Sequence, residues 1–143
     1  MRWFLLLLLG AAACGDGIPK NDFSCEEDCG ACVGSCPVGD CVFACETAAS
    51  CDFTCDGGGC TLDHDKIGVA ALECAGGGCV ATNSGGGRLS IPCPGNDCSL
   101  TCTGSGTCEI TACTAGCTLD CFGTGACDQT CTDPSCVTNT PAP

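Results

Sequence analysis

The chain has 143 residues, of which 22 are cysteine, and a formal net charge of −13 at pH 7. This cysteine density is typical of an exported, disulfide-stapled scaffold rather than of a protein kept in a reducing cytosol. The acidic charge repels nucleic acid and anionic lipid surfaces, so nucleic acid is not expected as a partner. After residue 13, Ile, Leu, Val and Phe make up only about 15% of the residues, which is too little for a conventional apolar core.

The first thirteen residues are predicted to be a signal peptide. Arg2 supplies a positive charge, and the apolar run "WFLLLLLG" that follows is too short to span a bilayer as a helix. With the small residues of "AAAC", which ends at Cys14, this start resembles the signal of bacterial lipoproteins. In that family the cysteine is lipidated and becomes the first residue of the mature chain. The resemblance therefore implies a membrane anchor on Cys14 and a place at the cell envelope or outer surface.

An ordinary signal peptidase is the alternative, because Ala11 and Ala13 also fit an A-x-A cleavage site. Both alternatives place the cut before Cys14, and cleavage by the ordinary signal peptidase would leave a secreted protein without a lipid. The short apolar run favours the lipoprotein. We expect residues 14–24 to be a lipidated N-terminus and flexible tether, residues 25–139 to form one repeat domain, and residues 140–143 to be a tail.

The repeat domain is built on a unit C-x-φ-x-C, in which φ is usually apolar. The unit recurs at alternating steps of 9 and 10 residues, so the full repeat has 19 residues in two similar halves. One series at this spacing is unbroken: Cys41, Cys60, Cys79, Cys98, Cys117 and Cys136. A second series departs from the period once, because Cys113 is displaced by one residue from Ala112, and the short turn "TAG" that follows restores the register.

Each unit is predicted to be a short β-strand. In a strand, alternate residues share a face, so Cys41, Phe43 and Cys45 would point one way and small or polar residues the other. A helix would also place the two cysteines on one face, but the units are five residues long and lie between turns such as "DGGG". Glycine costs about 1 kcal/mol per helical position and short helices are marginal. The pattern thus predicts an all-β fold, a small disulfide-rich β-solenoid with two short strands per coil and coils stacked about 4.8 Å apart.

The cysteines are expected to pair across turns. Two cysteines four residues apart in a strand are separated by about 13 Å, and a disulfide needs Cα atoms within about 7 Å. The turns offer nine pairs: Cys36–Cys41, Cys45–Cys51, Cys55–Cys60, Cys74–Cys79, Cys93–Cys98, Cys102–Cys108, Cys113–Cys117, Cys121–Cys127 and Cys131–Cys136. At two further turns, from His64 to Ala70 and from Asn83 to Leu89, cysteine is missing from both ends together, as disulfide partners would be.

A rival scheme bonds cysteines within one coil, such as Cys41 with Cys55. It ranks second because it leaves Cys36 and Cys136 without partners. Sequence alone is weak on connectivity, so both schemes stay open at this point.

Cys25, Cys29 and Cys32 are not assigned by either scheme. If Cys14 is lipidated, one of the three is left over or pairs between molecules. The "CGAC" segment at Cys29–Cys32 is the only C-x-x-C, whereas zinc knuckles come in pairs and a redox motif needs a βαβ context. A structural staple is therefore favoured, and a metal-thiolate protein is kept as a second alternative.

No catalytic constellation is visible. His64 is the only histidine, and it replaces an inward cysteine in "LDHDK". With Asp63 and Asp65 it could bind a cation, although a capping role is the more usual explanation. Acyl-transfer chemistry needs a partner nucleophile that is not apparent here. An enzyme is not expected, and neither a cofactor nor a metal is assigned.

Two resemblances support the solenoid architecture. "GGGCTLD" resembles the calcium-binding nonapeptide repeats of secreted toxins, although it lacks their Asp at the needed place. "TCTGSGTC" resembles the disulfide-stapled β-solenoid antifreeze proteins of insects, although the threonine row is irregular. The outward column that corresponds to this row is our candidate contact face: Val42, Thr61, Val80, Ser99, Thr118 and Val137.

The expected role is a non-enzymatic structural or binding module, with a protein or surface partner that the sequence does not identify. The alternative is a secreted acidic protein that binds cations such as calcium, weakly, through its surface carboxylates.

Overall fold

The computed structural model describes residues 22–25, 31–46 and 50–141, with side chains from residue 31 onward. The expected signal peptide, the lipidation of Cys14, most of the tether and Cys29 fall outside these residues. The described residues contain no helix and thirteen strands: β1 (Asp22–Cys25), β2 (Cys32–Cys36), β3 (Val42–Cys45), β4 (Ser50–Cys55), β5 (Thr61–His64), β6 (Val69–Glu73), β7 (Val80–Asn83), β8 (Arg88–Pro92), β9 (Ser99–Cys102), β10 (Thr107–Cys113), β11 (Thr118–Cys121), β12 (Cys127–Cys131) and β13 (Val137–Asn139). The all-β prediction is confirmed. β1 begins three residues before the expected start of the repeat domain.

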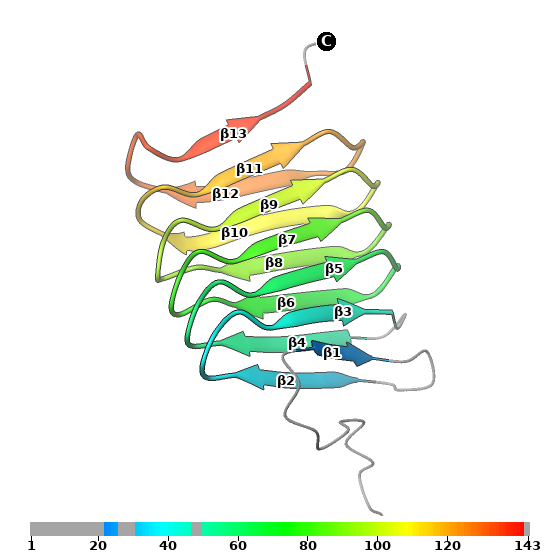
Figure 1. Cartoon of the computed structure of the whole chain (residues 1–143). Coiled ribbons are helices and arrows are strands. Elements are labelled where there is room, and N and C mark those ends of the chain that lie inside the picture. Colours follow the sequence, from blue (N-terminus) through cyan, green and yellow to red (C-terminus); the bar gives the residue numbers. More distant parts are fainter. Residues whose placement is uncertain (1–21, 26–30, 47–49, 142–143) are drawn as a thin grey trace, which may run out of the picture.

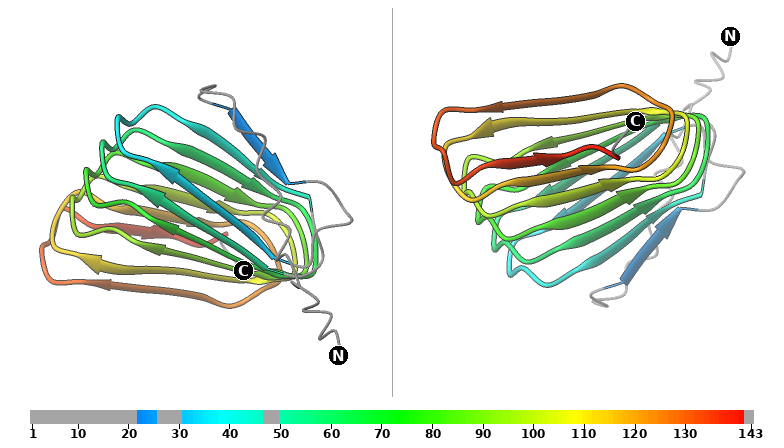
Figure 2. Two further views of the ribbon diagram at one scale, coloured as in Figure 1. Left: turned by 90° about the horizontal axis from the view of Figure 1, so that it is seen from below. Right: turned by 90° about the horizontal axis from the view of Figure 1, so that it is seen from above.

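The strands form two parallel sheets, and the coils of this β-solenoid stack on one another along both sheets (Figure 1). The odd-numbered strands make a seven-stranded sheet and the even-numbered strands a six-stranded sheet, so each coil gives one strand to each. Val42 pairs with Thr61 and Thr61 pairs with Val80, a shift of nineteen residues at each step. The predicted 19-residue coil is therefore confirmed. Figure 2 looks along the stack and shows the coils fanned out by the ordinary twist of parallel strands.

The interior lies between the sheets and is filled by the alternate residues of each strand. It consists of cysteine, leucine, isoleucine, alanine and two phenylalanines, with His64 and Asn83 as the buried polar residues of the described part. The rings of Phe43 and Phe53 stack with centroids 4.4 Å apart. Gly34 lies beside Phe53 in the register, where a Cβ would meet its ring at 3.0 Å. Glycine there makes room for the aromatic pair.

Two corners join the sheets. We call the corner after the even-numbered strands the short-turn corner (left in Figure 1) and the one after the odd-numbered strands the long-turn corner. At the short-turn corner, Gly58 has φ 78°, and a Cβ there would lie 2.6 Å from the carbonyl oxygen of Gly77 in the next coil. The stacked turns hold one another through hydrogen bonds such as Gly59 N to Gly77 O, 2.9 Å. Glycine is needed for both the left-handed backbone and this close stacking.

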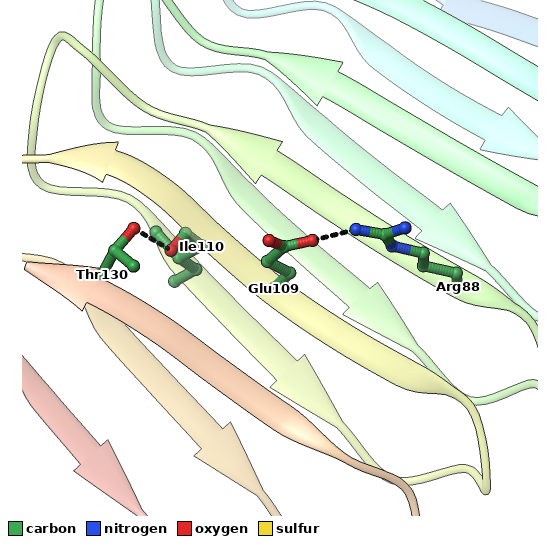
Figure 3. Close-up of polar contacts among 4 residues, drawn as sticks. All are labelled: Arg88, Glu109, Ile110 and Thr130. Atoms are coloured by element: carbon green, nitrogen blue, oxygen red, sulfur yellow. Dashed lines mark hydrogen bonds and ion pairs between the residues drawn. The ribbon is translucent and has the colours of Figure 1, made fainter.

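The period is interrupted once, in β10. Ile110 pairs with Gln129 at nineteen residues, but Cys113 pairs with Cys131 at eighteen, so a β-bulge lies between Ile110 and Cys113. Ala112 has φ 58° there, a left-handed conformation that is unfavourable for alanine. The Thr130 hydroxyl donates to the Ile110 carbonyl oxygen at 3.4 Å and ties β12 to β10 beside the bulge (Figure 3). The displacement of Cys113 in the sequence marks this feature.

The C-terminal coil closes the interior with polar side chains. Gln129 and Thr138 take the inward places of Ile110 and Leu119. The Gln129 amide donates to the Cys117 carbonyl at 3.1 Å, and the Thr138 hydroxyl lies 2.7 Å from Gln129 Oε1. The last described coil therefore carries hydrogen-bonded polar side chains at positions that are apolar in the coils before it.

Candidate functional site

Disulfides are the dominant chemical feature of the described chain. Nine are formed, each across one turn, with Cα atoms 6.1–6.5 Å apart: Cys36–Cys41, Cys45–Cys51, Cys55–Cys60, Cys74–Cys79, Cys93–Cys98, Cys102–Cys108, Cys113–Cys117, Cys121–Cys127 and Cys131–Cys136. These are the nine pairs of the across-turn scheme, so the within-coil rival does not describe these cysteines. Cys32 is also disulfide-bonded. The side chains of Cys25 and Cys29 lie outside the described residues.

The sulfurs at the short-turn corner are close enough to resemble metal sites. Four groups of three sulfurs lie within 4.8 Å of one another, for example those of Cys36, Cys55 and Cys60. All of these sulfurs belong to disulfides, however, and a disulfide sulfur is not the thiolate that binds a metal. The metal-thiolate alternative does not describe this oxidised form of the chain.

At the long-turn corner, His64 and Asn83 occupy the column of inward cysteines. In the register His64 follows Cys45, and Asn83 precedes Cys102. Asn83 acts as a hydrogen-bonding clamp: its amide donates to the Gly87 carbonyl at 3.0 Å, and its oxygen accepts from the Gly85 N–H at 3.2 Å. It thereby holds a turn that elsewhere is closed by a disulfide.

Unlike Asn83, His64 does not hold its turn by hydrogen bonds in place of the missing disulfide. Its side chain is buried, and neither ring nitrogen has a hydrogen-bond partner. Burial lowers the pKa of His64 below its usual 6.5, opposed by Asn83 and by the charge of Asp65. The imidazole is therefore neutral at pH 7, and it faces the interior rather than the carboxylates of its neighbours.

Those carboxylates line a hollow on the outer face of the seven-stranded sheet. The hollow has a volume of about 310 Å³ and is lined by Ala44, Glu46, Asp63, His64, Asp65, Thr82 and Ser84. Asp65 also lies 3.6 Å from the Lys66 ammonium. Among the described residues no three carboxylates bring their oxygens within 4.8 Å of one another. Asp63 and Asp65 both line the hollow, together with His64, whose side chain is otherwise buried.

The candidate contact face is one continuous row. Each member pairs with the next along the seven-stranded sheet: Val42, Thr61, Val80, Ser99, Thr118 and Val137. The three valines are 44–47% exposed. The six-stranded sheet is more mixed, since its outer face carries the ion pair of Arg88 with Glu109 (Figure 3) as well as Val33 and Val69.

A second hollow lies at the bulge and was not expected from the sequence. It has a volume of about 560 Å³ and is lined by Ala112, Cys113, Thr114, Gln129, Thr130, Cys131 and Thr132. It brings together cysteines of two different disulfides. The displaced Cys113 is the signal that could have drawn attention to this corner.

Comparison with known proteins gives no relative: no family model, no curated protein and no solved structure matches the chain. Among the described residues no helix is long and apolar enough to cross a membrane. The fold and the staples define the class of protein. It is a disulfide-rich β-solenoid of the kind suited to an oxidising, extracellular environment.

Proposed function

We propose that the protein is an exported, non-enzymatic lipoprotein that acts as a structural or binding module at the bacterial cell envelope or outer surface. The nine disulfides support an oxidising compartment, and the lipoprotein-like start supports an anchor on Cys14. The anchor would hold the solenoid at a membrane, and the solenoid would present its sheets outward. No cofactor takes part in this role.

The contact row from Val42 to Val137 is the observation that carries the binding role. Six uncharged side chains follow one another at about 4.8 Å, so the row extends for about 24 Å over the sheet. The surrounding surface is acidic, because 17 Asp and Glu oppose 4 Lys and Arg in the chain. Both Lys66 and Arg88 are already paired with carboxylates. An uncharged partner surface meets least electrostatic resistance along this row.

A pair of matched substitutions tests the binding role. Val80→Lys places a charge in the middle of the row, and Val69→Lys places one on the opposite sheet at a similarly exposed valine, 52% against 47%. We expect the unmodified protein to sediment with purified cell-wall fragments, Val80→Lys to lose most of this binding, and Val69→Lys to keep it. Equal binding by the two variants, or no binding by the unmodified protein, would refute the role of the row.

The anchor is tested separately. Expression of the full chain in a bacterium should give a mature protein that starts at Cys14, carries acyl chains and fractionates with membranes. Cys14→Ser should abolish lipidation and retain the unprocessed chain. Processing at Cys14 without added acyl mass would favour the secreted alternative.

The cation-binding alternative is supported by the hollow with Glu46, Asp63 and Asp65. It predicts that calcium raises the melting temperature and that Asp63→Asn removes the rise. The structural module predicts the same melting temperature with calcium and with a chelator.

A further inference from the structure

Two disulfides lie almost in contact at the C-terminal end of the short-turn corner. Cys113–Cys117 belongs to one coil and Cys131–Cys136 to the last. Sγ of Cys113 and Sγ of Cys136 are not bonded to each other, yet they lie only 4.0 Å apart. The Sγ of Cys131 belongs to the same group of sulfurs, all within 4.8 Å.

Solvent reaches one of these disulfides but not the other. Cys131 and Cys136, in the last described coil, are partly exposed, whereas Cys113 and Cys117 are buried. The hollow of about 560 Å³ at the bulge is lined by Cys113 and Cys131, and its other lining residues are uncharged. Because Asp133 lies in the turn that this disulfide closes, a neutral reagent meets less electrostatic resistance at the hollow than an anionic one.

We propose that this corner is a thiol–disulfide exchange site for an uncharged dithiol, a role beyond the structural one. A thiolate of the dithiol attacks Sγ of Cys131, forms a mixed disulfide and releases Cys136 as a thiolate. The Cys136 thiolate then attacks Sγ of Cys113, which lies 4.0 Å away. The Cys113–Cys136 bond forms, the Cys113–Cys117 bond breaks, and Cys117 leaves with the electron pair and is protonated from water.

The second thiolate of the dithiol completes the reaction. It attacks the mixed disulfide and releases Cys131, so the dithiol is oxidised to a cyclic disulfide and the chain is reduced by two electrons. Two thiols, on Cys117 and Cys131, and one new disulfide replace the two original disulfides. One thiol thus appears in the buried turn and one in the exposed turn, and the new Cys113–Cys136 bond links the two coils to each other.

The long-turn corner provides an internal control. Cys121–Cys127 is also near the C-terminal end, and Cys127 is partly exposed. Among the described residues its sulfurs form no group of three within 4.8 Å with those of Cys102–Cys108. Reduction there should give thiols on Cys121 and Cys127 alone, without exchange.

The test is limited reduction of the folded, oxidised full chain. The protein is treated with limiting dithiothreitol, quenched with acid, alkylated with N-ethylmaleimide and mapped by mass spectrometry of its peptides. We expect alkyl groups on Cys117 and Cys131 and a cross-linked peptide that contains Cys113 and Cys136. Labels on Cys131 and Cys136 with Cys113–Cys117 intact, or no reduction of this corner before the rest of the chain, would overturn the proposal.

A variant keeps the result interpretable. Cys113→Ser with Cys117→Ser removes the acceptor disulfide, so the label should move from Cys117 to Cys136. Circular dichroism of this variant and of the partly reduced protein shows whether the sheets are retained. Exchange that occurs equally at the Cys121–Cys127 control would also contradict the geometry, since it would point to general scrambling.

Discussion

A disulfide can be introduced across the turn from His64 to Ala70, and its effect on the free energy of unfolding can be calculated. In the register His64 follows Cys45 and Ala70 follows Cys51. The disulfide of Cys45 with Cys51 closes a sequence separation of 6 with Cα atoms 6.1 Å apart. His64 and Ala70 have the same separation in the next coil. His64→Cys with Ala70→Cys should therefore form a disulfide without a change of backbone.

The expected stabilisation follows from loop closure. A disulfide over so short a loop removes unfolded-state entropy worth about 2.2 kcal/mol. The change also removes a buried imidazole whose two nitrogens are unpaired, a group that by itself costs about 1–3 kcal/mol. Ala70 has little side chain to lose. We therefore expect the free energy of unfolding to rise by about 3–5 kcal/mol.

The turn from Asn83 to Leu89 is the matched comparison. Asn83→Cys with Leu89→Cys closes a turn of the same length, but it sacrifices the Asn83 hydrogen bonds to Gly87 and Gly85, about 1 kcal/mol each. It also truncates Leu89, which is fully buried, at a further cost of about 1–2 kcal/mol. These losses offset the loop-closure term, so we expect no gain or a small loss in stability.

Both double variants are measured by guanidinium unfolding followed by circular dichroism, with alkylation to count free thiols. The reasoning requires that both form the new disulfide and that only the pair at His64 stabilises. An equal gain at the two turns would show that the Asn83 clamp contributes little. If the variant with cysteines at positions 64 and 70 forms its disulfide but is less stable than the unmodified protein, the buried imidazole of His64 does not destabilise the fold as reasoned above.

Three further predictions follow from the same interior and turns. Because burial lowers the pKa of His64 from 6.5, the unfolded chain binds a proton at this histidine more readily than the folded chain does. The contribution of His64 to stability should therefore be fully present above pH 6.5 and be lost as the pH falls below it. In urea titrations at pH 4–8, His64→Asn should flatten this dependence of stability on pH. Gly58→Ala should destabilise the protein by at least about 2 kcal/mol in thermal melts, because Gly58 has a left-handed φ and a Cβ there would approach Gly77 closely. Gly86→Ala is the control: its added Cβ would meet no neighbouring atom closer than 3.5 Å, so stability should change by less than about 0.5 kcal/mol. Ala112→Gly should stabilise by up to about 1 kcal/mol, since glycine relieves the left-handed backbone of the bulge, and denaturant unfolding that shows a loss would contradict this.

The coil, its strands and its cysteine pairs were predictable because each depends on local geometry. A strand of five residues between glycine turns has only one way to bring its cysteines within bonding distance of others, which is across a turn. The joint loss of cysteine at His64 and Ala70 carried the same information, since a disulfide lost at one end is lost at both. The displacement of Cys113 likewise predicted a local change of register, and the structure places a β-bulge at this position.

The outer hollows were not predictable, because they depend on how neighbouring coils sit against each other. The sequence places Cys113 and Cys136 in different coils, but the 4.0 Å between their sulfurs depends on how closely neighbouring coils stack at the short-turn corner. The inward direction of His64 was readable, whereas its lack of hydrogen-bond partners was not. The alternation of inward and outward residues along a strand shows on which face of the sheet a side chain lies. Whether the ring nitrogens of His64 find hydrogen-bond partners depends on how the neighbouring turn packs against them.

In a solenoid this regular, chemistry specific to one place must arise where the period is broken. Intact coils repeat the same across-turn disulfides and the same alternation of inward and outward side chains, so they offer little to distinguish one coil from the next in reactivity. The described chain has three local breaks, the cysteine-free turns at His64 and Asn83 and the bulge at Ala112. The turn at His64 replaces covalent closure with a side chain that responds to pH, and beside the bulge a partly exposed disulfide lies next to a buried one. In the proposed function the intact outer row is the binding surface, and the breaks are the places where we expect the solenoid to respond to its surroundings.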